Sequence, residues 1–98
     1  MSHSLYPQRF VGVENDIDHG LYEQAREKLA AAASGRLSRQ ERAFAIILEA
    51  DIASRCAQFG AALRLQQRII NRQGISAPLR AAAIMSRAYT LGYSGDSV

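Results

Sequence analysis

The sequence predicts an all-α fold of about five helices, and three observations support this class. Apolar residues recur at helical spacing along most of the 98-residue chain. Alanine supplies 17 residues, whereas aromatic residues make up only 7% and tryptophan is absent, which suits packed helices better than a β-sandwich. A hydrophobic fraction of 48% with 21% charged residues is typical of one small globular domain. We expect this domain at residues 8–92, between flexible segments at 1–7 and 93–98.

Two helices are predicted in the first third of the chain. The first spans Gln8 to about Asp18, because apolar residues recur from Phe10 at i, i+3 and i+7 and share one face. Gly20 ends it, since glycine most easily adopts the left-handed conformation that terminates a helix. The second spans Leu21 to Ala33, with one apolar face and one charged face, and stops at Ser34-Gly35.

The densest apolar pattern runs from Ser38 to Gly74 and predicts two consecutive helices. The first, Arg39 to Cys56, begins with a capping box between Ser38 and Glu41. It is apolar on two opposite faces and therefore needs neighbours on both sides. The second, Phe59 to Gln73, has one apolar arc and an opposite arc of arginines, so we expect it at a surface.

A fifth helix is predicted to start at Ser76-Ala77-Pro78 and to continue from Leu79 to Leu91. Ser76 is its expected N-cap, and Pro78 is tolerated in the first turn because no intrahelical bond is lost there. Gly92 and the residues after it lack an apolar pattern, so we expect a loose tail.

The sequence contains no pattern typical of an enzyme, a metal site or a cofactor site. The two histidines, His3 and His19, cannot be placed beside the single cysteine, Cys56, and zinc-type Cys/His spacing is missing. No glycine-rich phosphate loop occurs. One cysteine agrees with a reducing compartment, and no secretion signal or membrane span is evident, so we expect a cytoplasmic protein.

An internal repeat is visible in the two segments Tyr22-Glu23-Gln24-Ala25 and Phe59-Gly60-Ala61-Ala62. They lie 37 residues apart, and each opens the second helix of a predicted pair. This arrangement resembles the tetratricopeptide repeat, whose period is about 34 residues, as a short superhelix of two stacked antiparallel pairs plus one extra helix. Ala57 stands where that motif favours an inter-helix glycine, and the usual proline between repeats is absent after Ile70.

The order of features from about residue 20 to 95 also resembles, more narrowly, the tetratricopeptide-like chaperones of the needle subunit in bacterial type III secretion systems. The features include Ala62-Leu63 after a short aromatic-led turn, and a final helix reaching Tyr89-Thr90-Leu91-Gly92. The resemblance implies that the concave surface of a helical repeat binds an amphipathic helix of the needle subunit, and that a second small protein, also a chaperone, stabilises the repeat. These motifs are generic apolar ones shared by other partner-binding repeats.

The first helix of each pair is expected to line a concave groove that captures an amphipathic helix of a partner protein. The expected lining residues are Phe10, Glu14, Ile17, Phe44, Ile47, Leu48, Asp51, Arg55, Met85 and Tyr89. Each apolar residue among them has an alternative role as ordinary core. Apolar ends of the short repeat stack also predict a second protein partner or self-association.

Nucleic-acid binding is the alternative hypothesis. Residues 34–98 contain nine basic and four acidic residues, a net charge of +5. Arg64, Arg68 and Arg72 follow one another at i, i+4 and i+8 and would form a basic stripe. They lie opposite an apolar face, where charges serve solubility, and no aromatic residues interleave with them for base stacking. We therefore favour a solvated face for this stripe.

Overall fold

The computed structural model describes residues 8–95, and within this range the chain is all-helical, as the sequence predicted. A short 3-10 helix, η1 (Gln8–Phe10), precedes five α-helices: α1 (Val11–Asp18), α2 (Tyr22–Ala33), α3 (Arg39–Arg55), α4 (Phe59–Asn71) and α5 (Ala77–Ser94). The segment 1–7, predicted to be flexible, and residues 96–98 of the predicted tail lie outside the described residues.

The predicted C-terminal boundary of the last helix is wrong. α5 passes through Gly92 without interruption and ends at Ser94, so Tyr93 and Ser94 belong to the helix rather than to a tail. Gly95 is the residue that ends it, with a left-handed φ of 78°. Glycine is costly within a helix but is tolerated where the flanking residues hold the helix in place.

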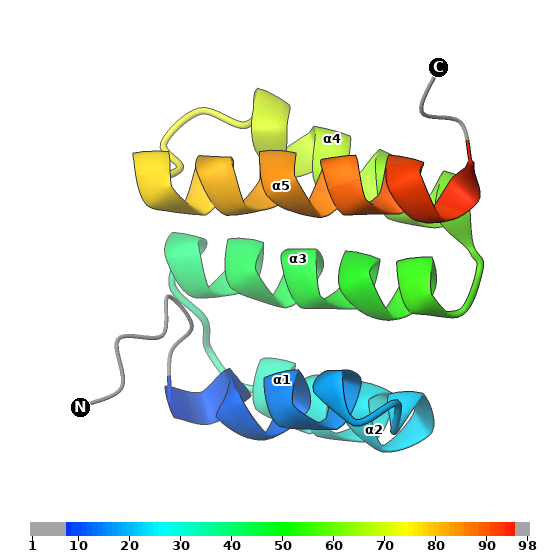
Figure 1. The fold of residues 1–98 in the computed structure, drawn as a ribbon. Coiled ribbons are helices and arrows are strands. Elements are labelled where there is room, and N and C mark those ends of the chain that lie inside the picture. Colours follow the sequence, from blue (N-terminus) through cyan, green and yellow to red (C-terminus); the bar gives the residue numbers. More distant parts are fainter. Residues whose placement is uncertain (1–7, 96–98) are drawn as a thin grey trace.

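The helices form two layers (Figure 1). α1, α3 and α5 lie side by side, with α3 in the middle, and α2 and α4 lie behind them. α3 packs against all four of the other α-helices, whereas α2 packs mainly on α1 and α3, and α4 mainly on α3 and α5. α3 is therefore the central element of the fold.

The core is divided by α3 into two main apolar clusters. The first lies among η1, α1, α2 and α3 and comprises Phe10, Val13, Ile17, Ala25, Leu29, Ala45, Leu48 and Ile52. The second lies among α3, α4, α5 and the loop before α5, and comprises Ala43, Ile47, Ile69, Ile75, Leu79 and Ala83. Adjacent residues Ile47 and Leu48 thus face opposite clusters, which is the two-sided packing that the apolar pattern of α3 predicts.

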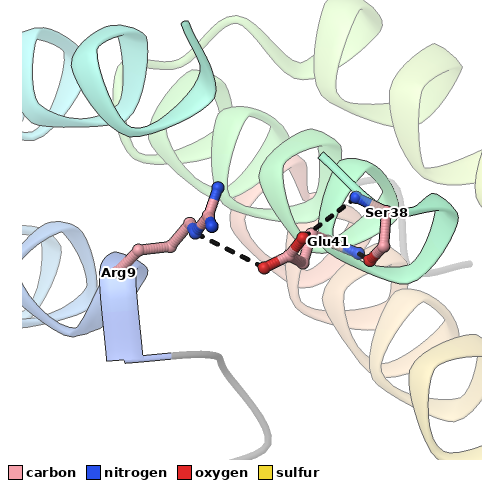
Figure 2. A network of polar contacts seen from close by, with 3 residues as sticks. All are labelled: Arg9, Ser38 and Glu41. Carbon is pink, nitrogen blue, oxygen red and sulfur yellow. Dashed lines mark hydrogen bonds and ion pairs between the residues drawn. The ribbon is translucent and has the colours of Figure 1, made fainter. Parts of the chain in front are cut away.

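A reciprocal pair of hydrogen bonds starts α3 (Figure 2). The Glu41 N–H donates to Ser38 Oγ at 3.1 Å, and the Ser38 N–H donates to Glu41 Oε1 at 2.9 Å, which confirms the predicted capping box. The second carboxylate oxygen of Glu41 lies 3.4 Å from Arg9 Nε, so η1 is tied to the start of α3. The backbone hydrogen bond from Ser38, with a smaller contribution from Arg9, lowers the pKa of Glu41.

The loop between α4 and α5 is also anchored to the first turn of α3. The side-chain amide of Gln40 donates to the Gly74 carbonyl at 2.9 Å, and its oxygen accepts from the Ser76 N–H at 3.1 Å. Ser76 then caps α5 by accepting from the Leu79 N–H, as predicted. These contacts fix the N-terminal end of α3 to the N-terminal end of α5.

The turns that close the α1–α2 and α3–α4 hairpins have the same geometry. Gly20 and Ala57, 37 residues apart, are both left-handed, with φ of 74° and 64°. In each turn the N–H of the next residue donates to the carbonyl five residues earlier, at 2.8 Å. This is the Schellman arrangement, in which the left-handed position favours glycine. The left-handed conformation therefore strains the backbone at Ala57 but not at Gly20, which has no Cβ.

Exchanging the residues at these matched turns should change stability in opposite directions. We expect Ala57→Gly to raise the free energy of unfolding by about 1 kcal/mol, because it relieves a left-handed alanine. Gly20→Ala should lower it by about the same amount, since the space around Gly20 is open and only the backbone conformation is strained. Urea denaturation followed by circular dichroism measures both changes. A destabilised Ala57→Gly variant would contradict this account.

Candidate protein-binding site

Four of the residues expected to line a partner groove are in the core. Phe10, Ile17, Ile47 and Leu48 are between 0% and 5% exposed, and their side chains contact other helices of this chain. In this conformation they have no surface to offer a partner. We therefore leave them out of the candidate site. The apolar periodicity identified these faces but could not tell which of them the chain's own helices cover.

The other expected residues are at least partly accessible but do not line one groove. Glu14, Phe44 and Asp51 are half-buried, and Phe44 packs against both main clusters. The Arg55 guanidinium is exposed and lies 5.6 Å from the ring centre of Tyr93. Met85 and Tyr89 are exposed on α5 at 57% and 62%, where they border a shallow depression of about 370 Å³ with Ala88.

Asp51 belongs to a hydrogen-bonded chain that links α3, α4 and α5. Ser86 Oγ donates to Asp51 Oδ1 at 2.6 Å, and the fully buried amide of Gln66 donates to Ser86 Oγ and Thr90 Oγ1, both at 2.8 Å. Thr90 Oγ1 in turn donates to the Ser86 carbonyl at 3.0 Å. These side chains pack helix against helix, and none of them lines the depression on α5 or the groove described below. We interpret this polar cluster as structural.

A second concavity, larger than the depression on α5, lies behind α3, between α2 and α4. It is a groove of about 800 Å³. It is lined by Arg26, Leu29, Ala30, Ala33, Gly35, Leu37, Arg42, Ala45, Ile46, Glu49, Ile52, Ala53, Gln58, Ala61 and Leu65. The floor is a third face of α3, and the walls come from α2 and α4, which pack on α3 without packing along one another.

The groove exists because α2 and α4 are held on different sides of α3. α2 is fixed by Ala25 and Leu29 in the first cluster, whereas α4 is fixed by Ala62 in a small cluster with Ala50 and Ala53. Alanines on both walls and on the floor leave the space between the helices unfilled. The spacing of two separately anchored helices determines the width of the groove.

The polar side chains of the groove are three charged residues and the amide of Gln58. Arg26 and Arg42 are exposed cations on α2 and α3, and Glu49 is an exposed carboxylate on the floor. The Arg26 guanidinium donates to the Gln58 side chain at 3.2 Å, which bridges the two hairpins at one end of the groove. Apolar walls with a few charges suit an amphipathic ligand.

The sequence contained partial signals for this groove. Leu37 is an apolar residue in an otherwise polar linker, and Ile46 and Leu65 remain only half-buried although both touch core clusters. Periodicity alone assigned α3 two apolar faces and no third one. The gap between α2 and α4 depends on tertiary packing, which no local pattern encodes.

The arginines of the alternative hypothesis lie on the exposed side of α4 and just after it. Arg64, Arg68 and Arg72 are all exposed, and Arg72 occupies the C-cap of the helix. The Arg72 carbonyl accepts a hydrogen bond from Arg80 at 2.7 Å. Exposure is compatible with both a solvated face and a phosphate-binding stripe, so the alternative stays a prediction.

Residues 8–95 hold neither a metal-ligand cluster nor a membrane-spanning helix. No cluster of three or more histidine, cysteine, aspartate or glutamate side chains is placed to hold a metal ion there. In the same range no helix is both long and apolar enough to cross a membrane. Cys56 is a free, half-buried thiol packed against the first cluster.

Comparison with known proteins found no significant match to a family model, a curated protein or a solved structure. The tetratricopeptide and needle-chaperone resemblances therefore stay predictions.

Removing the charge of Asp51 should stabilise the protein at neutral pH. Burial raises the pKa of Asp51, and the Ser86 hydrogen bond and Arg55 only partly oppose this effect; nearby Asp18 adds to it. A raised folded-state pKa means that stability is lost as the pH rises through it. Asp51→Asn, which can still accept from Ser86, should therefore raise the free energy of unfolding at pH 7.

The gain from Asp51→Asn should shrink as the pH falls from 7 through the raised pKa of Asp51, because the native carboxyl is then protonated and neutral as well. Denaturation curves of both proteins across this pH range measure the difference. A gain that is independent of pH, or a variant that is less stable at pH 7, would contradict the interpretation.

Proposed function

We propose that this protein is a non-enzymatic binding module whose groove between α2 and α4 captures an amphipathic helix of another protein. The observation that supports the proposal is the groove itself, which is about 800 Å³ and mostly apolar in its lining. Exposed apolar concavities of this kind are typical of binding sites.

The shape of the groove favours a helical ligand. Three helices surround it, and a fourth helix could lie between the walls on the floor of α3 at an ordinary interhelical distance of about 8–10 Å. Side chains at i, i+3, i+4 and i+7 of that helix would enter the apolar space. Ala30, Ala45, Ala53 and Ala61 are small, so they allow the bound helix to approach the three lining helices closely.

The charges around the groove would orient the ligand. Arg26 and Arg42 favour carboxylates on the flanks of the bound helix, and Glu49 favours a basic residue between them. Such rim charges change specificity and association rate more than affinity.

The class of partner follows from the sequence resemblance alone. We propose a self-assembling secreted subunit, as in the needle chaperones of type III secretion, with the complex formed in the cytoplasm. A module of this kind would cover an apolar helix until export. This part of the proposal fails if no such subunit binds, and the groove hypothesis does not depend on it.

A single bulky charge in the groove should abolish capture. Ala30 is an exposed wall residue of α2, and the next residue, Ala31, is exposed but does not line the groove. We expect Ala30→Glu to weaken binding at least roughly tenfold, or about 1.4 kcal/mol, and Ala31→Glu to leave it unchanged. The probe is a labelled helical peptide with leucines on one face and glutamine and serine on the other, measured by fluorescence anisotropy.

The salt dependence separates this proposal from nucleic-acid binding. Groove binding of the neutral peptide should change little between about 50 and 200 mM salt, whereas phosphate contacts weaken steeply over that range. Single-stranded and duplex oligonucleotides serve as the competing probes. Tight, salt-sensitive oligonucleotide binding that is lost when Arg64, Arg68 and Arg72 become alanine, with no peptide binding, would favour the alternative.

A further inference from the structure

The outward face of α5 is an apolar surface that no other helix within residues 8–95 packs against. Four large apolar side chains on this helix are more than half exposed: Ile84, Met85, Tyr89 and Tyr93. The inward face, by contrast, is buried through Leu79, Ala83, Ser86 and Thr90. α5 therefore has two opposite faces suited to packing, and only one is used.

The outward face has the spacing of a helix-packing stripe. Ala81, Ile84, Met85, Ala88 and Gly92 follow at i, i+3, i+4, i+7 and i+11, and all are exposed. The small residues Ala81, Ala88 and Gly92 would let a second helix approach closely. Met85, Ala88 and Tyr89 border the shallow depression of about 370 Å³ at its centre.

α5 also differs from the other helices of its layer. α1 is covered by α2, and α3 by α4, in each case by the helix that follows it in the chain. Within the described residues no such helix follows α5. An added helix on the outward face would complete a third pair.

The charges on and beside α5 determine which helix fits. Residues 52–95 contain six arginines and no aspartate or glutamate, and three of these arginines lie on α5 or against it: Arg80, Arg87 and Arg55, the last over the Tyr93 ring. Arg80 is engaged by carbonyls at the end of α4, those of Ile70 and Arg72, whereas Arg87 is exposed on the flank of α5. Asp51, the acid just before this segment, is already hydrogen-bonded to Ser86.

We propose that the outward face of α5 binds an acidic amphipathic helix of a second protein, at a surface separate from the groove. The apolar stripe receives the apolar face of that helix, and carboxylates on its flanks pair with Arg87 and with Arg55, which lies over the Tyr93 ring of α5. A second copy of this chain fits less well, because antiparallel pairing about the centre of the stripe would bring two Arg87 side chains together.

Two matched peptides test the proposal. Each is about 18 residues, five helical turns, with leucine and alanine on one face. One carries glutamates on the flanks and the other carries lysines at the same positions. By fluorescence anisotropy we expect the glutamate peptide to bind at least roughly tenfold more tightly than the lysine peptide, with affinity that falls as salt is raised.

Ala88→Arg separates docking from simple charge attraction. The change adds a positive charge but blocks the apolar stripe, so binding of the glutamate peptide should fall at least roughly tenfold. Gln24→Arg adds the same charge at an exposed position of α2 and should not reduce binding. Circular dichroism confirms that both variants keep their helicity. The groove variant Ala30→Glu should retain binding, which separates this proposal from the proposed function.

Four outcomes would overturn the proposal. The first is equal or tighter binding of the glutamate peptide by Ala88→Arg, and the second is equal binding of the two peptides by the native protein. The third is a native dimer, detected by light scattering, that Ala88→Arg converts to a monomer, because the occupant is then a second copy. The fourth is binding to phosphatidylserine vesicles that Ala88→Arg abolishes, without any peptide binding, because the surface is then a lipid site.

Discussion

The fold depends on the need to bury α3 from several sides at once. Its consecutive residues Ile47 and Leu48 are both 1% exposed, yet they face different clusters, so no single neighbouring helix could cover them. α1 and α2 cover one side, α4 and α5 the other, and the remaining face forms the floor of the groove. Because the other helices must cover α3, their positions around it are fixed. The proposed groove is the space that α2 and α4 leave open over the remaining face of α3.

The polar cluster adds specificity to this apolar arrangement. Leu79 and Ala83 would allow α5 to slide along its neighbours, because apolar contacts are not directional. The bonds from Gln66 to Ser86 and Thr90, and from Ser86 to Asp51, are satisfied in one register only. That register turns the apolar stripe of α5 outward. The buried contacts of α5 thus determine which of its side chains are exposed to a partner.

The helix caps could be predicted from the sequence, but which helix covers which apolar face could not. The Ser38–Glu41 capping box and the Ser76 cap follow from interactions within one turn, so the starts of α3 and α5 were predicted correctly. Phe10 and Leu48 were assigned to a groove because periodicity identifies an apolar face without identifying its neighbour. The space between α2 and α4 depends on how far apart separate clusters hold two helices, which the pattern of each helix does not contain.

The paired hairpin turns have a consequence for how quickly the chain folds. Each turn closes through hydrogen bonds between residues at most five positions apart, and the helices it joins pack on one another. Contacts between sequence neighbours cost little loop entropy, and helical proteins built from them fold in microseconds to milliseconds. The α1–α2 and α3–α4 hairpins can therefore form as separate local units, and the hydrogen bonds of Ser86 and Thr90 on α5 form only once Asp51 of α3 and Gln66 of α4 are both in place. The last step of folding would then create the outward surface of α5.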